Sequence, residues 1–399
     1  MPGPGSYWIG NEETQAVLEV MQSGHLSRYG DLNDPKFLHK VYDLENEFSK
    51  YIGVNHAVST SSGTSALMIS MLAMGLKPGD EVIMPAYTFV ASYTASIFLG
   101  VVPVLAEIDD SLTLDPNDIE HRITDKTKAI MPVHMLGNPC KMDEIMAIAN
   151  KHGLMVLEDC CQAAGASYRG KKLGSFGEMA GFSLNVFKTI TAGDGGVVVT
   201  NNKQMYEDAF GYHDQGHSPN RAGIEVGLRS VLGLNFRINE LTGAVALEQL
   251  KKIDRITQTL REKKNKFKKL VVGKADFKFR TLNDAEGECG TLCTVIFPSK
   301  EKADQISAAL GSKTISHSGW HVYYNMEHVL NWLKENKLPH TKGSYPATDD
   351  ILSRSLNISV GVVDGGLGSG WGININSNDE EIEFAAKQFI EACNTGLRM

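Results

Sequence analysis

The sequence predicts an α/β protein with a large, mainly parallel sheet and a smaller C-terminal α/β domain. Short apolar runs alternate with amphipathic stretches from about residue 55 onward. This alternation is typical of strands joined by helices, which form a parallel sheet covered on both faces. The pattern changes after about residue 256. A chain of 399 residues is long enough for two such domains.

Seven apolar runs are predicted strands: His56–Ser59, Glu81–Met84, Val101–Glu107, Ala129–His134, Met155–Glu158, Ala180–Ser183 and Gly196–Thr200. Three amphipathic stretches between them are predicted helices: Ser65–Met74, Lys141–His152 and Lys203–Ala209. Sites in sheets of this kind form beyond the carboxyl ends of the strands. Polar residues follow several of the runs directly, so we expect a site at that edge.

A long helix over Glu240–Glu262 is expected to lead from the large domain to the small one. Beyond it we expect a strand and two helices, at Cys289–Phe297, Glu301–Ala309 and Asp379–Ala392. Residues 1–30 are expected to pack as an arm. We therefore predict an arm with a large domain over residues 1–255, and a small domain over residues 256–399.

The composition excludes several classes of function. The net charge of −8 argues against nucleic acid as a partner, because phosphate contacts need clustered Lys and Arg. The basic stretch Arg261–Lys269 fits a solvated helix face. The six cysteines and twelve histidines show no zinc-site spacing, so no metal is expected. Without a signal peptide or a membrane-length apolar run, we expect a cytoplasmic protein.

A lysine stands between a predicted strand and a glycine-rich turn, in GFSLNVFKTITAGDGG. Apolar neighbours favour the neutral amine of this residue, Lys188, and a neutral amine is what a Schiff base requires. Three glycines, Gly193, Gly195 and Gly196, allow close backbone approach. Alone, the motif fits a surface lysine beside a turn equally well.

The run LMVLED ends in an acidic pair. A carboxylate at the end of a buried strand is costly without a cationic partner, and a protonated pyridine nitrogen is such a partner. The alternative is a helix N-cap, a common role of Asp. Beside the lysine motif we favour the cofactor role for Asp159, and a structural role for Glu158.

Two further motifs follow predicted strands. The segment SSGTSAL opens a helix after the first strand, where free N–H groups suit a phosphate, although a simple cap is the plainer interpretation. The segment MPAYTFV places Phe89 just after the second strand. There an aromatic ring either stacks on a cofactor or, more commonly, packs in the core.

Together these motifs resemble the DegT/DnrJ/StrS family of sugar aminotransferases, which are pyridoxal 5'-phosphate (PLP) enzymes of fold type I. The resemblance covers most of residues 15–260, through the segments SSGTSAL, PGDEVIMPAYTFVAS, KAIMPVHMLGN, LEDCCQAAGASYRGKKLGSFG, GFSLNVFKTITAGDGGVVVTN and GLNFRINELTGAVALEQL. It implies the aspartate-aminotransferase-like fold, with a large sheet domain and a smaller C-terminal domain.

The resemblance implies a role for each matching residue. Lys188 is the catalytic residue, which binds PLP and shuttles a proton. Asp159 meets the ring nitrogen, Gln162 lies near the ring hydroxyl, and Phe89 stacks on the ring. The phosphate is held by Gly63, Thr64, Ser65 and Ser183. Asn235 reaches the partner's phosphate across a homodimer interface.

The implied reaction moves an amino group from glutamate or glutamine to a keto sugar by a ping-pong mechanism. The amino sugar would serve polysaccharide (including lipopolysaccharide) or natural-product biosynthesis. Two alternatives are a PLP-dependent sugar dehydratase, whose family branch has histidine where Lys188 stands, and a catalytically silent regulator. No feature points to nucleic acid or membrane partners.

The C-terminal half departs from the family pattern. WHVYYN stands where other members have His-Tyr-Pro, and residues 362–372 are unusually rich in glycine. We favour a loop near the substrate over a surface turn for residues 362–372.

The acceptor is suggested by three segments. PVHMLGNPCKMDEI, FKTITAGDGG and WHVYYN resemble members that make 8-amino-3,8-dideoxy-manno-octulosonate. For a nucleotide-linked acceptor, Arg28, Arg229 and Arg237 are candidate anion ligands. His213 and His217 receive no role.

Overall fold

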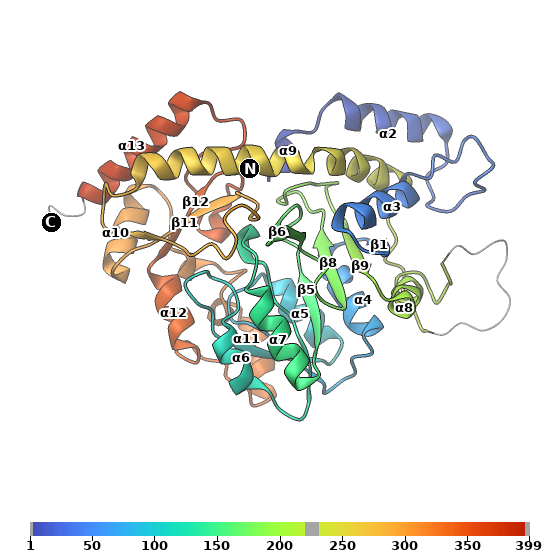
Figure 1. Cartoon of the computed structure of the whole chain (residues 1–399), viewed down its shortest axis with the longest axis horizontal. Helices are drawn as coiled ribbons and strands as arrows, with labels where there is room; N and C mark the ends of the chain where they lie inside the picture. Colours follow the sequence, from blue (N-terminus) through green and yellow to red (C-terminus); the bar gives the residue numbers. More distant parts are fainter. Residues whose placement is uncertain (1–2, 220–230, 396–399) are drawn as a thin grey trace.

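A seven-stranded sheet forms the centre of the computed structural model, which describes residues 3–219 and 231–395 (Figure 1). The strands run in the order β1-β9-β8-β5-β4-β2-β3. Their bounds are β1 His56–Thr60, β2 Glu81–Pro85, β3 Val102–Ala106, β4 Thr127–Ile130, β5 Met155–Asp159, β8 Met179–Ser183 and β9 Gly196–Thr200. Only β9 pairs antiparallel, with β1 and with β8, so the predicted mainly parallel sheet is confirmed.

One predicted strand is too long. We expected Ala129–His134, but β4 ends at Ile130. Pro132 follows and has no N–H to donate to the ladder. The chain then turns toward β5, where the His134 N–H donates to the Asp159 carbonyl at 3.1 Å. Of residues 131–134, which lie beyond the strand, Val133 lines the cavity described below.

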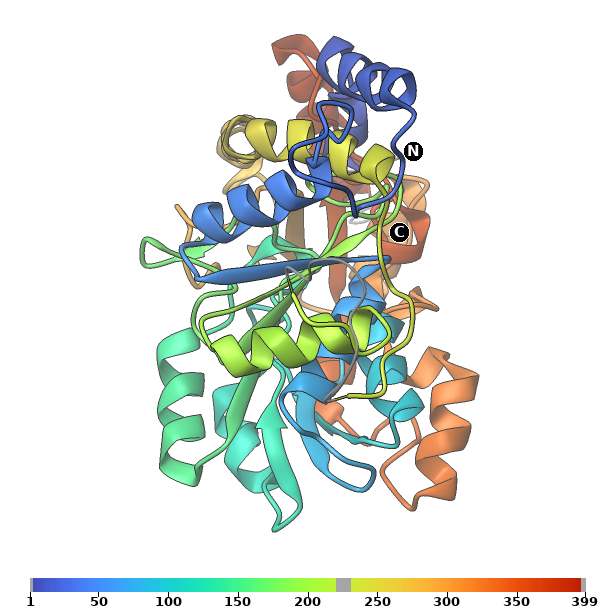
Figure 2. The same cartoon turned by 90° about the vertical axis from the view of Figure 1, so that its right-hand side faces the viewer.

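Helices cover both faces of the sheet. On one face α4 (Gly63–Ala73) packs on β8 and β9 and against α5 (Val90–Phe98) and α8 (Lys203–His213). On the other, α3 (Lys40–Ile52) packs on β1, and Figure 2 shows α3 in blue and α8 in light green on opposite sides of that strand. Further elements of this region are α6 Pro116–Arg122, α7 Met142–His152, β6 Ser167–Tyr168 and β7 Lys171–Lys172.

A single 32-residue helix, α9 (Glu240–Val271), lies along both parts of the molecule (Figure 1). We expected it to end at Glu262, but buried residues continue at helical spacing through Leu260, Phe267 and Val271. The predicted domain boundary at residue 255 therefore lies inside a continuous helix. The helices that pack on α9 include the short α1 Pro4–Tyr7, α2 Asn11–Ser23, α3 and α13 Asp379–Thr395.

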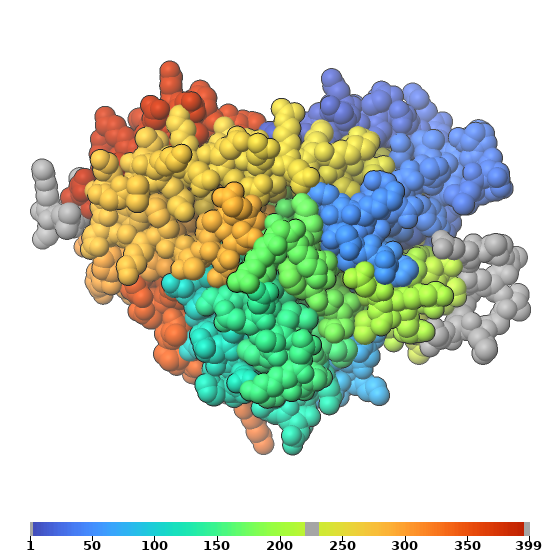
Figure 3. Space-filling model, viewed as in Figure 1, coloured from blue at the N-terminus to red at the C-terminus, as the bar shows by residue number. Residues whose placement is uncertain are grey.

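The C-terminal part contains a second, antiparallel sheet of three strands: β10 Lys278–Phe279, β11 Leu292–Ile296 and β12 Ser355–Ser359. Its helices are α10 Lys300–Ala309, α11 Glu327–Glu335, α12 Pro346–Ser353 and α13. Figure 3 shows these orange segments lying directly against the teal middle of the chain. Within the described ranges, no helix has the length and apolar character that crossing a bilayer requires.

Candidate active site

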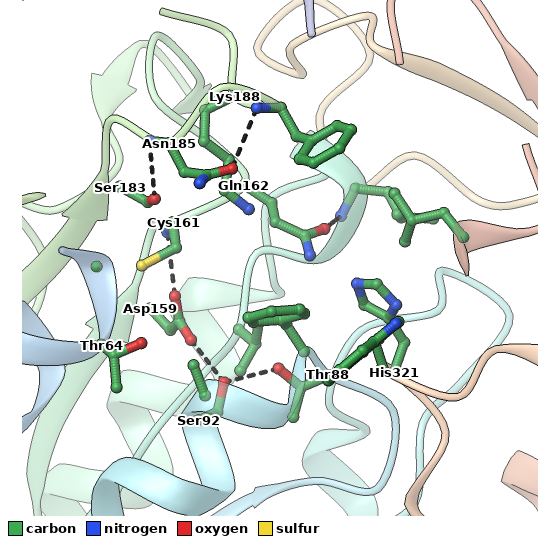
Figure 4. A pocket seen from close by; sticks show the side chains of 18 of the residues that line it. Thr64, Thr88, Ser92, Asp159, Cys161, Gln162, Ser183, Asn185, Lys188 and His321 are labelled. Carbon is green, nitrogen blue, oxygen red and sulfur yellow. Dashed lines mark hydrogen bonds between the residues drawn. The ribbon is translucent and has the colours of Figure 1, made fainter. Parts of the chain in front are cut away.

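A cavity of about 470 Å³ lies at the carboxyl ends of the large sheet, where C-terminal segments close over them (Figure 4). Seven residues singled out in the sequence line it together: Gly63, Thr64, Phe89, Asp159, Gln162, Ser183 and Lys188. They come from the carboxyl ends of four strands, β1, β2, β5 and β8, or from the segments directly after them. The expectation of a site at this edge agrees with the geometry.

The N-terminus of α4 points its first amide groups into the cavity. Ser62 is the N-cap, and its Oγ accepts the Ser65 N–H at 3.0 Å. In the described part of the chain, the N–H groups of Gly63 and Thr64 have no protein acceptor, as expected for the first turn of a helix. A Cβ on Gly63 would lie 2.8 Å from the Ser183 Cβ, so only glycine permits this approach.

Ser65 is placed differently from the other phosphate-loop candidates. Its side chain is buried and does not line the cavity. The Ser65 Oγ accepts the Ser62 N–H at 2.9 Å, which completes a reciprocal capping box. Ser65 therefore holds the helix start, and its neighbours face the cavity.

Asp159, the last residue of β5, is oriented by two hydrogen bonds. Its Oδ2 accepts the Ser92 hydroxyl at 2.7 Å, and its Oδ1 accepts the Cys161 N–H at 3.0 Å. Ser92 is buried, and its Oγ lies 2.8 Å from the Thr88 hydroxyl. This chain of bonds, drawn in Figure 4, leaves a fixed carboxylate facing the cavity. The sequence did not reveal the roles of Ser92 and Thr88, because Ser92 lies on α5 and Thr88 lies just before that helix.

Lys188 lies in the loop between β8 and β9, with its Nζ 5.6 Å from the centre of the Phe89 ring. Burial lowers the pKa of Lys188, and the nearby Cys161, Asp159 and Asp364 oppose that shift without cancelling it. The lowered pKa agrees with the neutral amine expected from the sequence. A neutral lysine amine is both a nucleophile and a base.

Phe89, Gln162 and Ser183 surround the same space. Phe89 is 38 % exposed, so its ring faces the cavity and not the core. The Gln162 Oε1 accepts the Leu136 N–H at 3.0 Å, which directs the side-chain amide along the cavity wall. Ser183 Oγ accepts the Asn185 N–H at 3.3 Å.

Residues of the C-terminal part complete the cavity, among them Trp320, His321 and Asp364. Trp320 and His321 lie beside the residues at the start of α5. The Thr88 N–H donates to the His321 carbonyl at 3.0 Å, and the Val90 N–H donates to the Trp320 carbonyl at 2.8 Å. Burial lowers the pKa of His321 to about 3, and the charge of Lys188 adds to the shift. Asp364 places the glycine-rich segment at the cavity, in agreement with the loop that we favoured.

Asn235 and the candidate anion ligands lie outside this cavity. Asn235 lines a neighbouring hollow together with Arg28, Asp194 and Arg237. Arg28 is buried and bonded to Glu45 at 3.0 Å, and Arg237 is bonded to Asp214. Both arginines are thus paired within the chain. Arg229 lies outside the described residues.

Glu158, beside Asp159, faces away from the site. It accepts N–H groups from Gly174, Phe176 and Gly177 at 2.7–2.9 Å, and its Oε2 lies 3.3 Å from His134 Nε2. Burial alone would raise the pKa of Glu158, but these bonds lower it. His134 and Glu158 lie with Cys160 in a metal-like arrangement, yet the ligand atoms of His134 and Glu158 already have protein partners. The expected structural role of Glu158 fits this geometry.

The residues around the cavity suit PLP. Free amides at a helix N-terminus suit its phosphate, a fixed carboxylate suits its ring nitrogen, and a lysine of lowered pKa suits its aldehyde. The glycine at position 63 leaves room that a side chain would fill.

Comparison with known proteins agrees with this geometry. Residues 8–363 match the DegT/DnrJ/EryC1/StrS aminotransferase family. The chain belongs to this family. Because the family is PLP-dependent, the cofactor predicted from the sequence is confirmed.

Two relatives are GDP-perosamine synthases. That of Caulobacter vibrioides is 39% identical over 247 residues, which are 62% of this chain and 63% of that protein. That of Escherichia coli O157:H7 is 37% identical over 259 residues, which are 65% and 68%. The match thus spans slightly less than two thirds of the Caulobacter protein. A solved aminotransferase from Psychrobacter cryohalolentis superposes with a TM-score of 0.81 at 25% identity, covering 100% of this chain and 98% of that one, and confirms fold type I.

Proposed function

We propose that this chain is a PLP-dependent aminotransferase that moves an amino group from glutamate or glutamine to a keto sugar. The observation that carries the proposal is one cavity in which Lys188, Asp159 and the free amides of α4 converge. When bound, PLP supplies a carbonyl carbon for the amino group and a ring that delocalises electrons. Every other requirement falls on side chains and backbone amides of the protein.

The positions of the cavity residues support the following cofactor-binding roles. The Asp159 carboxylate, held by Ser92 and the Cys161 N–H, keeps a proton on the ring nitrogen. The amides of Gly63 and Thr64, with the Ser183 hydroxyl, bind the phosphate, and Ser65 maintains the cap that aims those amides. Phe89 covers one face of the ring, and Gln162 lies at its hydroxyl.

Lys188 moves the proton. Its Nζ would take a proton from the alpha carbon of the donor and deliver it to the carbonyl carbon that PLP supplies for the amino group. A positioned general base of this kind contributes about 100- to 10,000-fold. The lowered pKa of Lys188 favours the unprotonated amine that the first transfer needs. The donor leaves as a keto acid before the sugar enters, so one cavity serves both substrates in turn.

The acceptor is bound at the end of the cavity formed by the C-terminal segments. Asp364 offers a carboxylate to sugar hydroxyls, and the ring of Trp320, 58% exposed, offers a flat apolar face. The GDP-perosamine synthases among the relatives favour a nucleotide-linked hexose. The octulosonate is the second candidate, because the WHVYYN segment that suggested it supplies Trp320 and His321 to the cavity.

The alternative activities have less support. A dehydratase of this family has histidine at the position of Lys188, and a silent scaffold would not need an aligned lysine, carboxylate and helix N-terminus. We further propose a cytoplasmic homodimer in which Asn235 reaches the partner's phosphate. The position of Asn235 outside the cavity of its own chain supports this arrangement.

The decisive variant is Lys188→Ala, with Lys203→Ala as a matched control, because the Lys203 side chain is 81% exposed. The purified protein should show the visible absorption of lysine-bound PLP, which glutamate or glutamine bleaches. Lys188→Ala should lose this absorption and at least about 100-fold of the turnover. Retention of either would refute the proposal. Keto sugars screened with ¹⁵N-labelled donor would then identify the acceptor.

A further inference from the structure

The first described residues of the chain lie buried beneath the loop that carries Lys188. Gly3, Pro4 and Gly5 are all buried, although they stand at the start of the chain. The Gly3 N–H donates to the Val186 carbonyl at 2.9 Å, and the Ser6 hydroxyl donates to the same oxygen at 3.1 Å. One carbonyl of the lysine loop is thus held by two donors of the N-terminal segment.

Two glycines make this contact possible. A Cβ on Gly3 would lie 2.3 Å from the carbonyl carbon and oxygen of Phe187 and 2.8 Å from the carbonyl oxygen of Lys188. A Cβ on Gly5 would lie 2.8 Å from the Ile190 Cα and 3.0 Å from the Thr189 carbonyl oxygen. These are backbone atoms, which cannot rotate away as a side-chain tip does. The φ of Gly3 is −76°, which other residues also adopt. Glycine is therefore needed at this position because the backbone of the lysine loop lies so close, and not because of a turn.

The N-terminal segment is itself anchored to α9. The amide of Gln249, on α9, donates to Glu13 Oε1 at 2.8 Å, and its Oε1 accepts the Thr191 N–H at 3.4 Å. Lys252, one turn further along, bonds both Glu13 and the Trp8 carbonyl. The lysine loop is therefore tied to α9 at Thr191 and covered by the N-terminal segment at Val186 to Ile190.

The two sides of the loop have different tasks. Phe187, Lys188 and Thr189 line the cavity, while the backbone of the same residues packs on Gly3 and Gly5. We propose that Gly3–Ser6 is a strap that positions Lys188 Nζ relative to Asp159 and Phe89. The proposal rests on the proposed function for the importance of Nζ. Gly3, Gly5 and Ser6 are positioning residues, because none of them lines the cavity.

The test compares Gly3→Ala and Ser6→Ala with Gly10→Ala. Gly10 lies on the same segment, but its Cβ would meet only the carboxylate end of Glu12, at 3.1 Å. Because a misplacement of about 1 Å at a reacting group costs up to about 100-fold, Gly3→Ala should lower turnover by about tenfold or more. It should also shift the pH midpoint of the absorption of lysine-bound PLP. Ser6→Ala should shift the midpoint in the same direction by less, and Gly10→Ala should match the unaltered protein.

A readout without cofactor separates the strap from the proposed function. In the apo protein, hydrogen exchange of residues 184–191 should quicken in Gly3→Ala and Ser6→Ala, and not in Gly10→Ala. An unchanged midpoint and unchanged exchange in both strap variants would overturn the strap. If Gly3→Ala does not fold, Ser6→Ala decides, because it only removes atoms. Absence of the lysine-bound absorption from the unaltered protein would instead refute the role of Lys188.

Discussion

The two ends of the cavity are built in different ways. The cofactor end comes from strand termini and the loops directly after them, with Asp159 and Ser183 ending adjacent strands β5 and β8. The end that we propose for the acceptor includes Trp320, His321 and Asp364, which belong to irregular segments of the C-terminal part. Neighbouring strands position side chains through a shared hydrogen-bond ladder, whereas loops depend on a few contacts with another part of the chain. We expect variants at the cofactor end to abolish chemistry, and variants at the acceptor end to change substrate use.

Asp159→Asn should have the largest effect. It keeps the shape of the side chain but removes the negative charge at the ring nitrogen, so turnover should fall about 100- to 1,000-fold. Steady-state kinetics and melting temperature, measured beside Asp125→Asn in an exposed turn, would check this. A loss below tenfold in Asp159→Asn would show that the carboxylate is not the ring partner.

Gly63→Ala should weaken cofactor binding without abolishing it. The added Cβ would lie 2.8 Å from the Ser183 Cβ and 2.9 Å from Cys161 Sγ, and overpacking of this kind costs roughly 1–3 kcal/mol. We expect the dissociation constant of PLP, from titration of the apo protein, to rise about tenfold or more. Unchanged affinity would place the phosphate away from α4.

Asp364→Ala tests the acceptor end. Loss of a hydrogen bond to a charged group costs about 1.5–3 kcal/mol, so kcat/KM for the sugar should fall about 10- to 100-fold. Bleaching by the amino donor should stay within about twofold, since that half-reaction precedes sugar binding. Stopped-flow measurement of each half-reaction separates the two. Equal losses in both would contradict the division of the cavity into two ends.

The smallest effect concerns stability at mildly acidic pH. Burial lowers the pKa of His321 to about 3, from an ordinary value of 6.5. The unfolded chain therefore binds a proton below pH 6.5 that the folded chain does not, so His321 destabilises the fold as pH falls from 6.5 toward 3. In His321→Gln, denaturant unfolding at pH 7 and pH 5 should differ less than in the unaltered protein. His328→Gln, at an exposed position, should leave that difference unchanged.

Local patterns predicted most of the large domain. All seven predicted strands lie in one sheet, and the motifs after them converge on one cavity, because parallel strands carry their carboxyl ends to the same edge. The predicted ends of elements were wrong where a single residue or a long-range contact determines the end. Pro132 ends β4 early, and the buried face of α9 extends that helix beyond Glu262.

Side-chain assignments followed the same division. Lys188 and Asp159 stand out because a charged group at the end of an apolar run needs an explanation. Ser92 and Thr88 did not stand out, because hydroxyls on helices are common and gain meaning only when Asp159 lies 2.7 Å away. Ser65 was grouped with the phosphate loop, yet only the capping geometry shows that its side chain turns back to Ser62.

By itself, the sequence determined the fold class and the family, and it singled out Lys188 and Asp159 as candidates for the cofactor site, because these follow from local periodicity and from motifs a few residues long. Only the tertiary structure decided that Trp320, His321 and Asp364 close the cavity and that Gly3–Ser6 underlies the lysine loop. The hydrogen bonds of those segments join residues 180 or more positions apart along the chain. These contacts depend on how the C-terminal segments and α9 pack on the large sheet, and no local pattern encodes that packing.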